Sequence, residues 1–290
     1  MYGMFGIETS IENIYKLAAP FVGDTDIEKM QDLKPSYVNY LKSVHSEFPI
    51  LNDPEIVVRD LTRSNQFASA FSASIIDDLN QERMVGDNYS KDLLLANAEL
   101  VQRSLAQLKI IRPDLAELFD LAVHAVVLCN SNRNSEGFSA HGGTTNRCIG
   151  LIWLNLRPEI SEQNVLEMLI HELTHTLVFL DELNNEHFNY YNITKQEFWA
   201  QSSILKRQRP MDKVIHSIIV SMELLYTRKE FLPTEPGQKL LHPSSQELVK
   251  NISASIQSVL EHPRLHEVCK PRAIELVQLA KEQLKIYEAM

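Results

Sequence analysis

The residues best suited to chemistry are His171, Glu172 and His175, which form an HExxH motif within 165–183. Residues four apart on a helix lie about 40° apart around its axis, so both imidazoles face one side and can bind one metal ion. Glu172 lies beside them and is suited to act as a general base on a metal-bound water. Two histidines and a glutamate in an apolar run cost desolvation free energy unless something binds them. The motif therefore favours a metal site over two satisfied core histidines.

The stretch that carries the motif has the features of one long helix. Ser161 is suited to cap its N-terminus, Glu162 suits the first turn, and neither Gly nor Pro interrupts the run to Leu183. Apolar residues cover most sides of this helix, namely Leu166, Leu169, Ile170, Leu173, Leu177, Val178 and Leu180. We therefore expect it to be central and buried.

The composition is that of a soluble globular protein. The chain has 290 residues, 44% hydrophobic and 23% charged, enough for one large core or two lobes. Its formal net charge of −10 argues against nucleic acid or an anionic membrane as the main partner. No apolar run approaches about 18 residues, so no transmembrane span is expected. The first residues show no secretory signal, and a cytoplasmic location is the simplest interpretation.

The cysteines suggest neither a disulfide framework nor a cysteine-based zinc site. There are three of them, Cys129, Cys148 and Cys269, an odd number at wide spacing. Glycine is scarce, with 9 residues, which suits a mainly helical chain that has few tight turns.

We expect a predominantly helical α+β fold in one compact unit. Its segments are a helical N-terminal region (1–120), a metal-site core (121–232) and a helical C-terminal region (233–290). The predicted N-terminal helices are 7–21, 34–44, 54–79 with Asp53 as cap, and 90–111. The C-terminal region reads as two helices, broken at His262-Pro263 and Lys270-Pro271.

The core segment combines a small sheet with the HExxH helix. Two β-rich runs, 122–128 and 148–155, flank a polar loop at 130–146 and lead directly into the helix. Zinc peptidases share this order of elements, which is an analogy only. Two further helices are predicted beyond it, at 195–206 and 211–229.

Two histidines need at least one more protein ligand, and spacing tests the candidates. Asp181 would match a metzincin pattern, but that pattern needs Gly where this chain has Val178. Without that turn Asp181 stays helical, about 240° around the axis from His175, and points elsewhere. Glu197 lies 22 residues after His175 and fits a gluzincin pattern loosely, with Gln196 in place of the usual Asn.

The third candidate is His216, inside the apolar run 214–222. Glu223 falls within about 20° of it around the helix axis, where a carboxylate could orient the imidazole. A buried histidine bonded to a carbonyl is the plain alternative. On the residues alone, His216 and Glu197 both stay open as the third ligand beside His171 and His175.

The stretch from Cys129 to Phe231 resembles a bacterial family of HExxH-motif peptide-modification proteins. This family includes HExxH-type 2-oxoglutarate-dependent β-hydroxylases of ribosomally made precursor peptides. The similar parts are a Ser/Asn/Gly loop, the Gly-Leu-Ile-Trp-Leu-Asn run at 150–155, the motif segment 169–181, and the segment 209–217 with its Arg-Pro start and second His. They cover roughly a third of the chain.

The resemblance implies non-haem iron(II) held by His171, His175 and His216, with 2-oxoglutarate at the open positions. It also implies oxidation of an unactivated C–H bond on a peptide side chain. Such iron sites more often have two histidines and a carboxylate, which keeps Glu172 and Glu223 as further candidates. The co-substrate carboxylate needs a cation, for which Arg209 and Arg228 are candidates; a solvated surface Arg is the alternative for both.

Three readings of function remain open. The first is an iron(II)/2-oxoglutarate hydroxylase acting on a peptide or protein substrate, possibly a leader-bearing precursor. The second is a zinc metallopeptidase with Glu172 as general base and Glu197 or His216 as third ligand. The third is a non-catalytic helical protein with a vestigial site. We predict a metal-dependent peptide-modifying enzyme, hydroxylase first and peptidase second.

Overall fold

Helices form most of the chain, as expected. The computed structural model describes residues 2–23, 26–52, 55–72, 84–158, 160–235 and 237–288. The predicted fold class, a predominantly helical α+β protein, is confirmed. The α-helices are α1 (Tyr2–Phe5), α2 (Ile7–Ala18), α3 (Lys34–Val44), α4 (Leu61–Ala68), α5 (Lys91–Ile111), α6 (Pro113–Ala122), α7 (Glu162–Asn185), α8 (Met211–Glu230), α9 (Ser245–Leu260), α10 (Leu265–Val268) and α11 (Pro271–Glu288).

A small mixed sheet lies beside the helix that carries the motif. Its strands are β1 (Val85–Asn88), β2 (Ala125–Ser131), β3 (Gly142–Thr144) and β4 (Leu151–Leu154), in the order β1-β2-β4-β3. β2 and β4 are parallel, whereas β1 and β3 pair antiparallel to them. The β-rich runs of the sequence thus become β2 and β4, and β3 forms inside the predicted polar loop. This order leaves β3 at an edge of the sheet.

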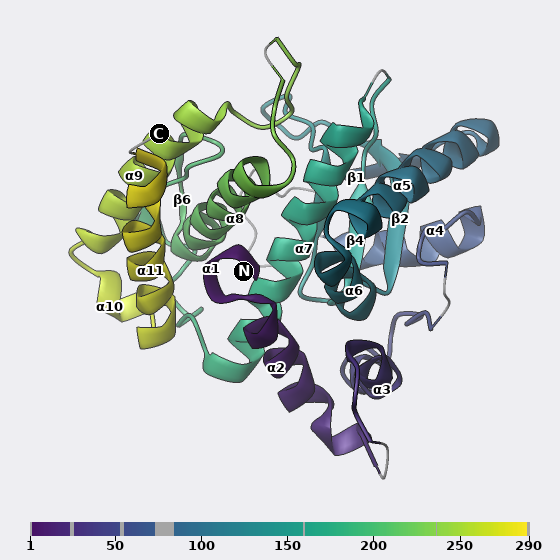
Figure 1. Ribbon diagram of the computed structural model, residues 1–290. Helices are drawn as coiled ribbons and strands as arrows, with labels where there is room; N and C mark the ends of the chain where they lie inside the picture. Colours follow the sequence, from purple (N-terminus) through teal and green to yellow (C-terminus); the bar gives the residue numbers. More distant parts are fainter. Residues whose placement is uncertain are drawn as a thin grey trace.

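The motif helix α7 is central to the arrangement. It contacts α5, α2 and β3 on one side and α8 on the other, and it passes through the middle of the molecule between these elements (Figure 1). Its N-terminus is capped as predicted, because the Ser161 hydroxyl accepts a hydrogen bond of 3.2 Å from the Asn164 backbone N–H. A buried helix with a defined start fixes where the motif histidines lie.

The buried apolar residues form two clusters that meet at α7. One cluster contains the sheet, α5 and α6, and it includes Leu173 and Leu177 of α7. The other contains α8, α9 and α11, and it includes Val178. α7 therefore presents apolar side chains to both clusters, which explains why it is apolar on most sides. The division into 1–120, 121–232 and 233–290 stays a prediction.

The N-terminal region differs from the sequence expectation in two places. Residues 54 and 73–79 of the helix predicted over 54–79 lie outside the described residues, and within 55–72 the α-helix is the shorter α4. It begins at Leu61 and is capped by Asp60, whose carboxylate accepts from the Arg63 N–H at 2.8 Å. The proposed cap Asp53 lies outside the described residues. β1 was not predicted, since its sequence has no apolar alternation and its conformation depends on pairing with β2.

The helix predicted over 195–206 is wrong. A short 3-10 turn, Gln196–Phe198, leads into a hairpin of β5 (Trp199–Gln201) and β6 (Gln208–Pro210). Two serines follow β5, and hydroxyls such as theirs compete with helical backbone hydrogen bonds: the Ser202 hydroxyl accepts from the Leu205 N–H, and the Ser203 hydroxyl donates to the Ser217 carbonyl. The C-terminal helices, by contrast, break at His262-Pro263 and at Lys270-Pro271, as the sequence predicted.

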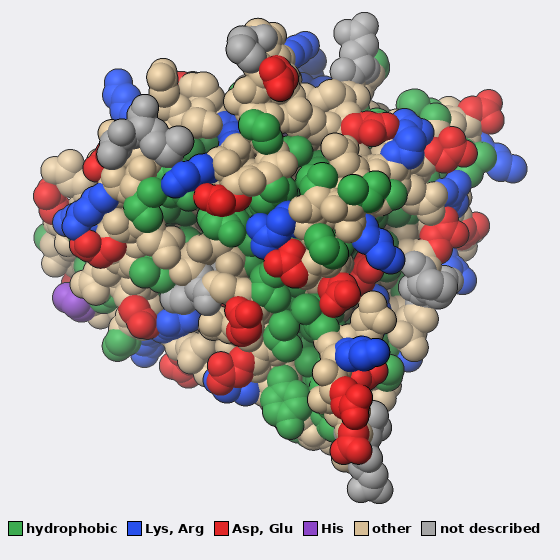
Figure 2. All heavy atoms as spheres, viewed as in Figure 1, with side chains coloured by type: hydrophobic (Ala, Val, Ile, Leu, Met, Phe, Trp, Pro, Cys, Tyr) green, Lys and Arg blue, Asp and Glu red, His purple; other side chains and the backbone are tan. Residues whose placement is uncertain are grey.

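Acidic and basic side chains alternate over the visible surface. Figure 2 shows Lys and Arg interspersed with Asp and Glu, without a large area of one sign on this face. Among the described residues, no helix combines the length and the apolar character needed to cross a membrane.

Candidate metal centre

The three motif residues converge as the sequence predicted. One ligand atom from each of His171, Glu172 and His175 lies within 4.8 Å of the others, and the two imidazole rings have centroids 5.0 Å apart. The Glu172 side chain is 6% exposed and that of His171 is 15% exposed, so the carboxylate is covered while a histidine edge stays open. This is an arrangement that can hold a metal ion and still admit a small ligand.

The neighbouring helix α8 brings His216 to this cluster. Its Nδ1 lies 3.1 Å from the Nδ1 of His175, and the two rings are stacked with centroids 5.3 Å apart. This distance is that of a hydrogen bond between the two rings, and the ligand atoms that lie within 4.8 Å of one another are those of His171, Glu172 and His175, without His216. His216 adjoins the motif from the His175 side.

The protonation of these histidines suits metal binding. Burial holds the pKa of His171, His175 and His216 well below the ordinary histidine value, and positive neighbours add to the effect at His175 and His216. The rings are therefore neutral and carry a lone pair. Among the described residues, His171 Nδ1 and Glu172 Oε2 are buried without a hydrogen-bond partner. Donor atoms left unpaired in this way fit a bound cation.

Strand β3 lies directly against the motif carboxylate. Burial raises the pKa of Glu172 to about 8, and a hydrogen bond with the Thr144 side chain opposes part of that rise. A Cβ atom at Gly142 would lie 2.8 Å from the Trp153 carbonyl and 3.2 Å from Glu172 Oε1. The glycine is thus needed for the close approach of this edge strand to Glu172.

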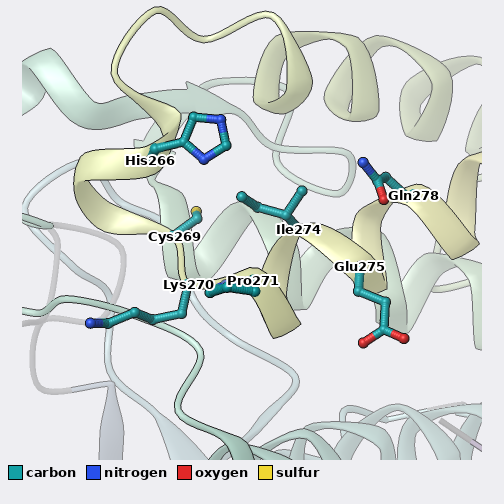
Figure 3. A pocket seen from close by; sticks show the side chains of 7 residues that line it. All are labelled: His266, Cys269, Lys270, Pro271, Ile274, Glu275 and Gln278. Atoms are coloured by element: carbon teal, nitrogen blue, oxygen red, sulfur yellow. The ribbon is translucent and has the colours of Figure 1, made fainter.

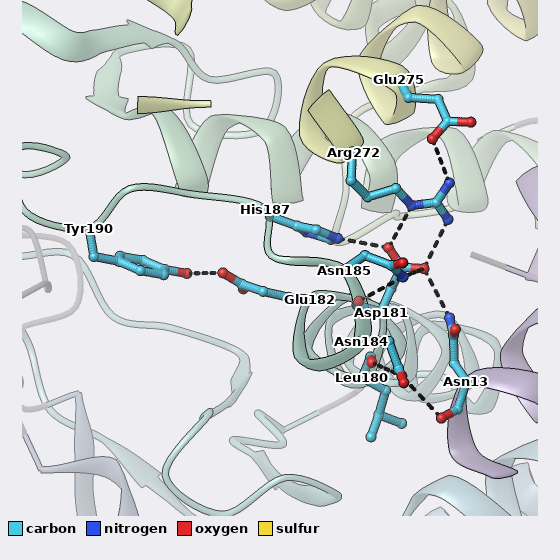
Figure 4. A network of polar contacts seen from close by, with 10 residues as sticks. All are labelled: Asn13, Leu180, Asp181, Glu182, Asn184, Asn185, His187, Tyr190, Arg272 and Glu275. Carbon is cyan, nitrogen blue, oxygen red and sulfur yellow. Dashed lines mark hydrogen bonds and ion pairs between the residues drawn. The ribbon is translucent and has the colours of Figure 1, made fainter. Parts of the chain in front are cut away.

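Asp181 is part of a buried polar network and not of the site, in agreement with the orientation inferred from the missing glycine. Its carboxylate accepts hydrogen bonds from Asn13 at 2.9 Å, from His187 at 2.7 Å, and from Arg272 through two bonds of 2.9 Å (Figure 4). Burial alone would raise its pKa, but the bonds from His187 and Arg272 hold the pKa well below the ordinary value. Asp181 therefore ties α7 to α2 and α11.

The alternative ligand Glu197 is not brought to the histidines. Its side chain is 54% exposed and forms an ion pair with Arg264. The gluzincin pattern assumed that Glu197 lies on a helix packed against the motif helix, whereas the chain forms a 3-10 turn and a hairpin there. The spacing alone was therefore misleading.

Glu223 does not orient His216, because its carboxylate accepts from the backbone N–H groups of Gly3 at 2.8 Å and Met4 at 3.2 Å. The angular match with His216 was correct, but seven residues along a helix also add roughly 10 Å of rise. Glu223 instead holds the N-terminal segment against α8.

Arg228 is not available for a co-substrate carboxylate. It is buried and donates to both oxygens of Glu167, at 2.8 and 2.7 Å. Arg209 stays a candidate, because its charge lowers the pKa of His175 and His216 and it therefore lies near them. Lys213 lowers the pKa of the same two histidines more than Arg209 does. The sequence reasoning missed Lys213, although it lies three residues before His216 and so on the same face of the helix.

His242 is another residue near the motif that sequence reasoning missed. Its ring stacks on that of His171, with centroids 4.8 Å apart. It lies in the irregular segment between α8 and α9, where no periodic pattern marks a side chain as facing inward. The histidine before Pro243 was the only signal in the sequence, and it is a weak one.

A pocket beside α10 and α11 is separate from this centre. It is lined by His266, Cys269, Lys270, Pro271, Ile274, Glu275 and Gln278 (Figure 3). In the part of the chain that the structure describes, the group of side chains close enough to hold a metal is the one on α7. The chemistry is therefore sought at α7.

Two comparisons, with family models and with curated sequences, found no match for this chain.

Proposed function

We propose that this protein is a metal-dependent peptide-modifying enzyme, in the first place an iron(II)/2-oxoglutarate peptide side-chain β-hydroxylase. The observation that carries the proposal is the cluster of His171, buried Glu172 and His175, with His216 within hydrogen-bond distance of His175. The family resemblance supplies the choice of reaction. A cytoplasmic location and a ribosomally made precursor peptide as substrate are parts of the same proposal.

His171, His175 and His216 are the side chains that would hold the ion. When bound, iron(II) with 2-oxoglutarate supplies the power to oxidise an unactivated C–H bond, and zinc would supply a Lewis acid. The imidazoles bind as neutral donors without losing a proton, since burial already keeps them uncharged.

Two cations near the His175–His216 pair support an anionic co-substrate. Arg209 and Lys213 both act electrostatically on these rings. A dicarboxylate bound beside them would gain charge-assisted hydrogen bonds. Lys213 also pairs with Asp212 at 2.9 Å, which holds its ammonium group at the start of α8.

The edge strand β3 supports a peptide as substrate. Edge strands can pair with an added strand through their backbone groups. Gly142 and Gly143 carry no side chain that would keep a second backbone away, and the strand runs beside Glu172. A peptide that pairs there would place its side chains near the histidines.

The zinc peptidase is the second candidate, and one observation favours it. Burial raises the pKa of Glu172 to about 8, close to the value at which a carboxyl group can accept and return a proton near neutral pH. Such a peptidase would cleave the paired peptide instead of oxidising it. The vestigial-site reading predicts no metal binding at all.

Metal analysis of protein purified without oxygen and without added metal tests the proposal. The iron(II) form is then titrated with 2-oxoglutarate. A weak visible charge-transfer band supports the hydroxylase. Stoichiometric zinc without a response to 2-oxoglutarate supports the peptidase, and Glu172→Gln should then abolish cleavage while zinc stays bound. Protein that binds neither metal refutes both candidates.

A further inference from the structure

A short surface segment lies against the motif. Residues 239–243, between α8 and α9, are all at least partly exposed. The His242 ring of this segment nevertheless lies on the ring of His171, with centroids 4.8 Å apart and an angle of 16° between the planes. Because the rings are nearly parallel, His242 covers one face of the His171 imidazole. We call residues 239–243 the strap.

The strap is fastened by side chains of α7 and α8. Three contacts hold it: Asn164 donates to the Lys239 carbonyl at 2.9 Å, Arg228 donates to the Pro243 carbonyl at 2.6 Å, and Nδ1 of His242 lies 2.7 Å from Oε1 of Glu167. Among the described residues, no backbone group of the strap forms a hydrogen bond with another backbone group. A segment held in this way opens locally at a lower free energy than one paired into a helix or sheet.

His242 can leave Glu167 without leaving a buried charge unpaired. Arg228 donates to both oxygens of Glu167, at 2.8 and 2.7 Å, so the carboxylate keeps its counter-charge. The His242 side chain is 13% exposed, whereas those of Glu167 and Arg228 are 2% and 3% exposed. The ion pair is therefore the fixed part of this contact, and the imidazole is the part that can move into solvent.

The residues on either side of the strap suit a hinged movement. Gly237 lies two residues before it with φ +80°, a conformation that other residues rarely adopt. Ser244 follows it directly, and its hydroxyl caps α9 by accepting from the Glu247 N–H at 3.3 Å. One end of the strap thus follows a turn, and the other is fixed to a helix.

With the strap in place, the motif is open only at an edge. The side chains of His171 and Glu172 are 15% and 6% exposed. Strand β3 lies against Glu172, and the strap lies against His171, so the two flank the motif. An opening of this size suits an ion or a small ligand, and a peptide paired with β3 needs more room.

We propose that the strap is a movable cover of the metal site, which lifts from His171 to admit a peptide and then closes again. The inference rests on the proposed function, because it requires a metal at the motif and a peptide as the substrate. His242 acts here by covering the site and not by binding the ion.

Two rates measured on the full chain test the inference without any assay of activity. Hydrogen exchange of the strap amides reports its opening, and withdrawal of bound zinc by EDTA reports access to the ion. His242→Ala removes the ring and its contact with Glu167. We expect both rates to rise about 10- to 100-fold, the factor that corresponds to one hydrogen bond to a charged group. Zinc affinity should stay that of the wild type. His266→Ala, whose ring is exposed on α10, is the control and should leave both rates unchanged.

Asn164→Ala provides a second variant, which frees the Lys239 carbonyl and leaves the His242 ring in the chain. It should raise both rates by about 2- to 10-fold. Circular dichroism and melting temperature show that the variants are folded.

The inference is overturned if the strap amides exchange faster while zinc withdrawal is unchanged, or if neither rate changes. A fall in zinc affinity without faster amide exchange also overturns it, because His242 would then act on the ion itself. These outcomes leave the proposed function standing. A wild type that binds no zinc and no iron(II) refutes both.

Discussion

Two sets of acidic and histidine side chains lie on or against the same helix and differ in how they are paired. At the motif, His171 Nδ1 and Glu172 Oε2 are buried without a partner in the described structure. Ten residues after His171, both oxygens of Asp181 accept hydrogen bonds, and an arginine balances its charge. The first set has donor atoms left for a ligand, whereas the carboxylate of the second is fully used.

A histidine–carboxylate pair alone does not distinguish the two. His187 and Asp181 lie 2.7 Å apart, and so do His242 and Glu167. The difference is the surroundings of the histidine: His242 stacks on a motif histidine, whereas His187 lies at the end of α7 among residues that link helices. An unpaired ring nitrogen alone does not mark a metal site, since Nδ1 of His187 is also buried without a partner; the motif differs in having an unpaired carboxylate oxygen and two histidines within reach of one another.

Removing Asp181 should have the largest effect on stability. Asp181→Ala leaves the Arg272 guanidinium partly buried without its main counter-charge, and it removes the partner of His187 and Asn13. We expect the free energy of unfolding to fall by about 3–5 kcal/mol. Urea unfolding measures it. Metal content, measured on the folded fraction, should stay that of the wild type.

Glu275→Ala is the matched control for that experiment. Glu275 pairs with the same Arg272 at 2.8 Å, but its side chain is 63% exposed. Exposed pairs contribute about 0–1 kcal/mol, so the loss should be below about 1 kcal/mol. Equal losses in the two variants would contradict the assignment of Asp181 as the central residue of the network.

His171→Gln should weaken metal binding and leave stability nearly unchanged, the opposite of Asp181→Ala. We expect metal affinity to fall by more than about 100-fold, beyond the effect of losing a residue that only orients a ligand. The free energy of unfolding of the metal-free protein should change little, because no partner atom loses a hydrogen bond from His171 Nδ1. Equilibrium dialysis with zinc and urea unfolding in chelator give the two values. A stability loss like that of Asp181→Ala would make His171 a structural residue.

The sequence was sufficient for features that depend on short-range periodicity. The motif helix, its Ser161 cap and the convergence of His171, Glu172 and His175 follow from helical geometry and apolar spacing. The strands that became β2 and β4 are rich in β-branched or large apolar residues, and the structure confirms them.

Features that depend on distant partners could not be predicted in this way. Glu197 failed because the predicted helix around it is a hairpin, and Arg228 failed because its partner Glu167 is 61 residues away. Nothing local to His242 shows that the segment carrying it folds over α7. Lys213 could have been predicted, because residues three or four apart on a helix share a face, which is the rule that also paired His171 with His175.

Glu223→Ala extends the comparison to a third carboxylate, which holds the N-terminal segment against α8. Removing it leaves the N–H groups of Gly3 and Met4 without this acceptor. We expect a loss of about 1–3 kcal/mol in the free energy of unfolding. Metal affinity should equal that of the wild type. A loss of metal without a loss of stability would restore Glu223 to the neighbourhood of His216.

The smallest expected effect is a pH dependence of the stability that Asp181 provides at the C-terminal end of α7. The folded pKa of Asp181 is depressed, so the stability it provides is complete above its unfolded pKa, about 3.9, and is lost as pH falls below that value. Asp181→Asn lacks this contribution at every pH. The stability gap between the wild type and Asp181→Asn should therefore be constant from pH 7 to about 5 and narrow by about 1 kcal/mol at pH 3. Urea unfolding at these pH values measures the gap, and a gap that widens on acidification would contradict an ionised Asp181 in the folded protein.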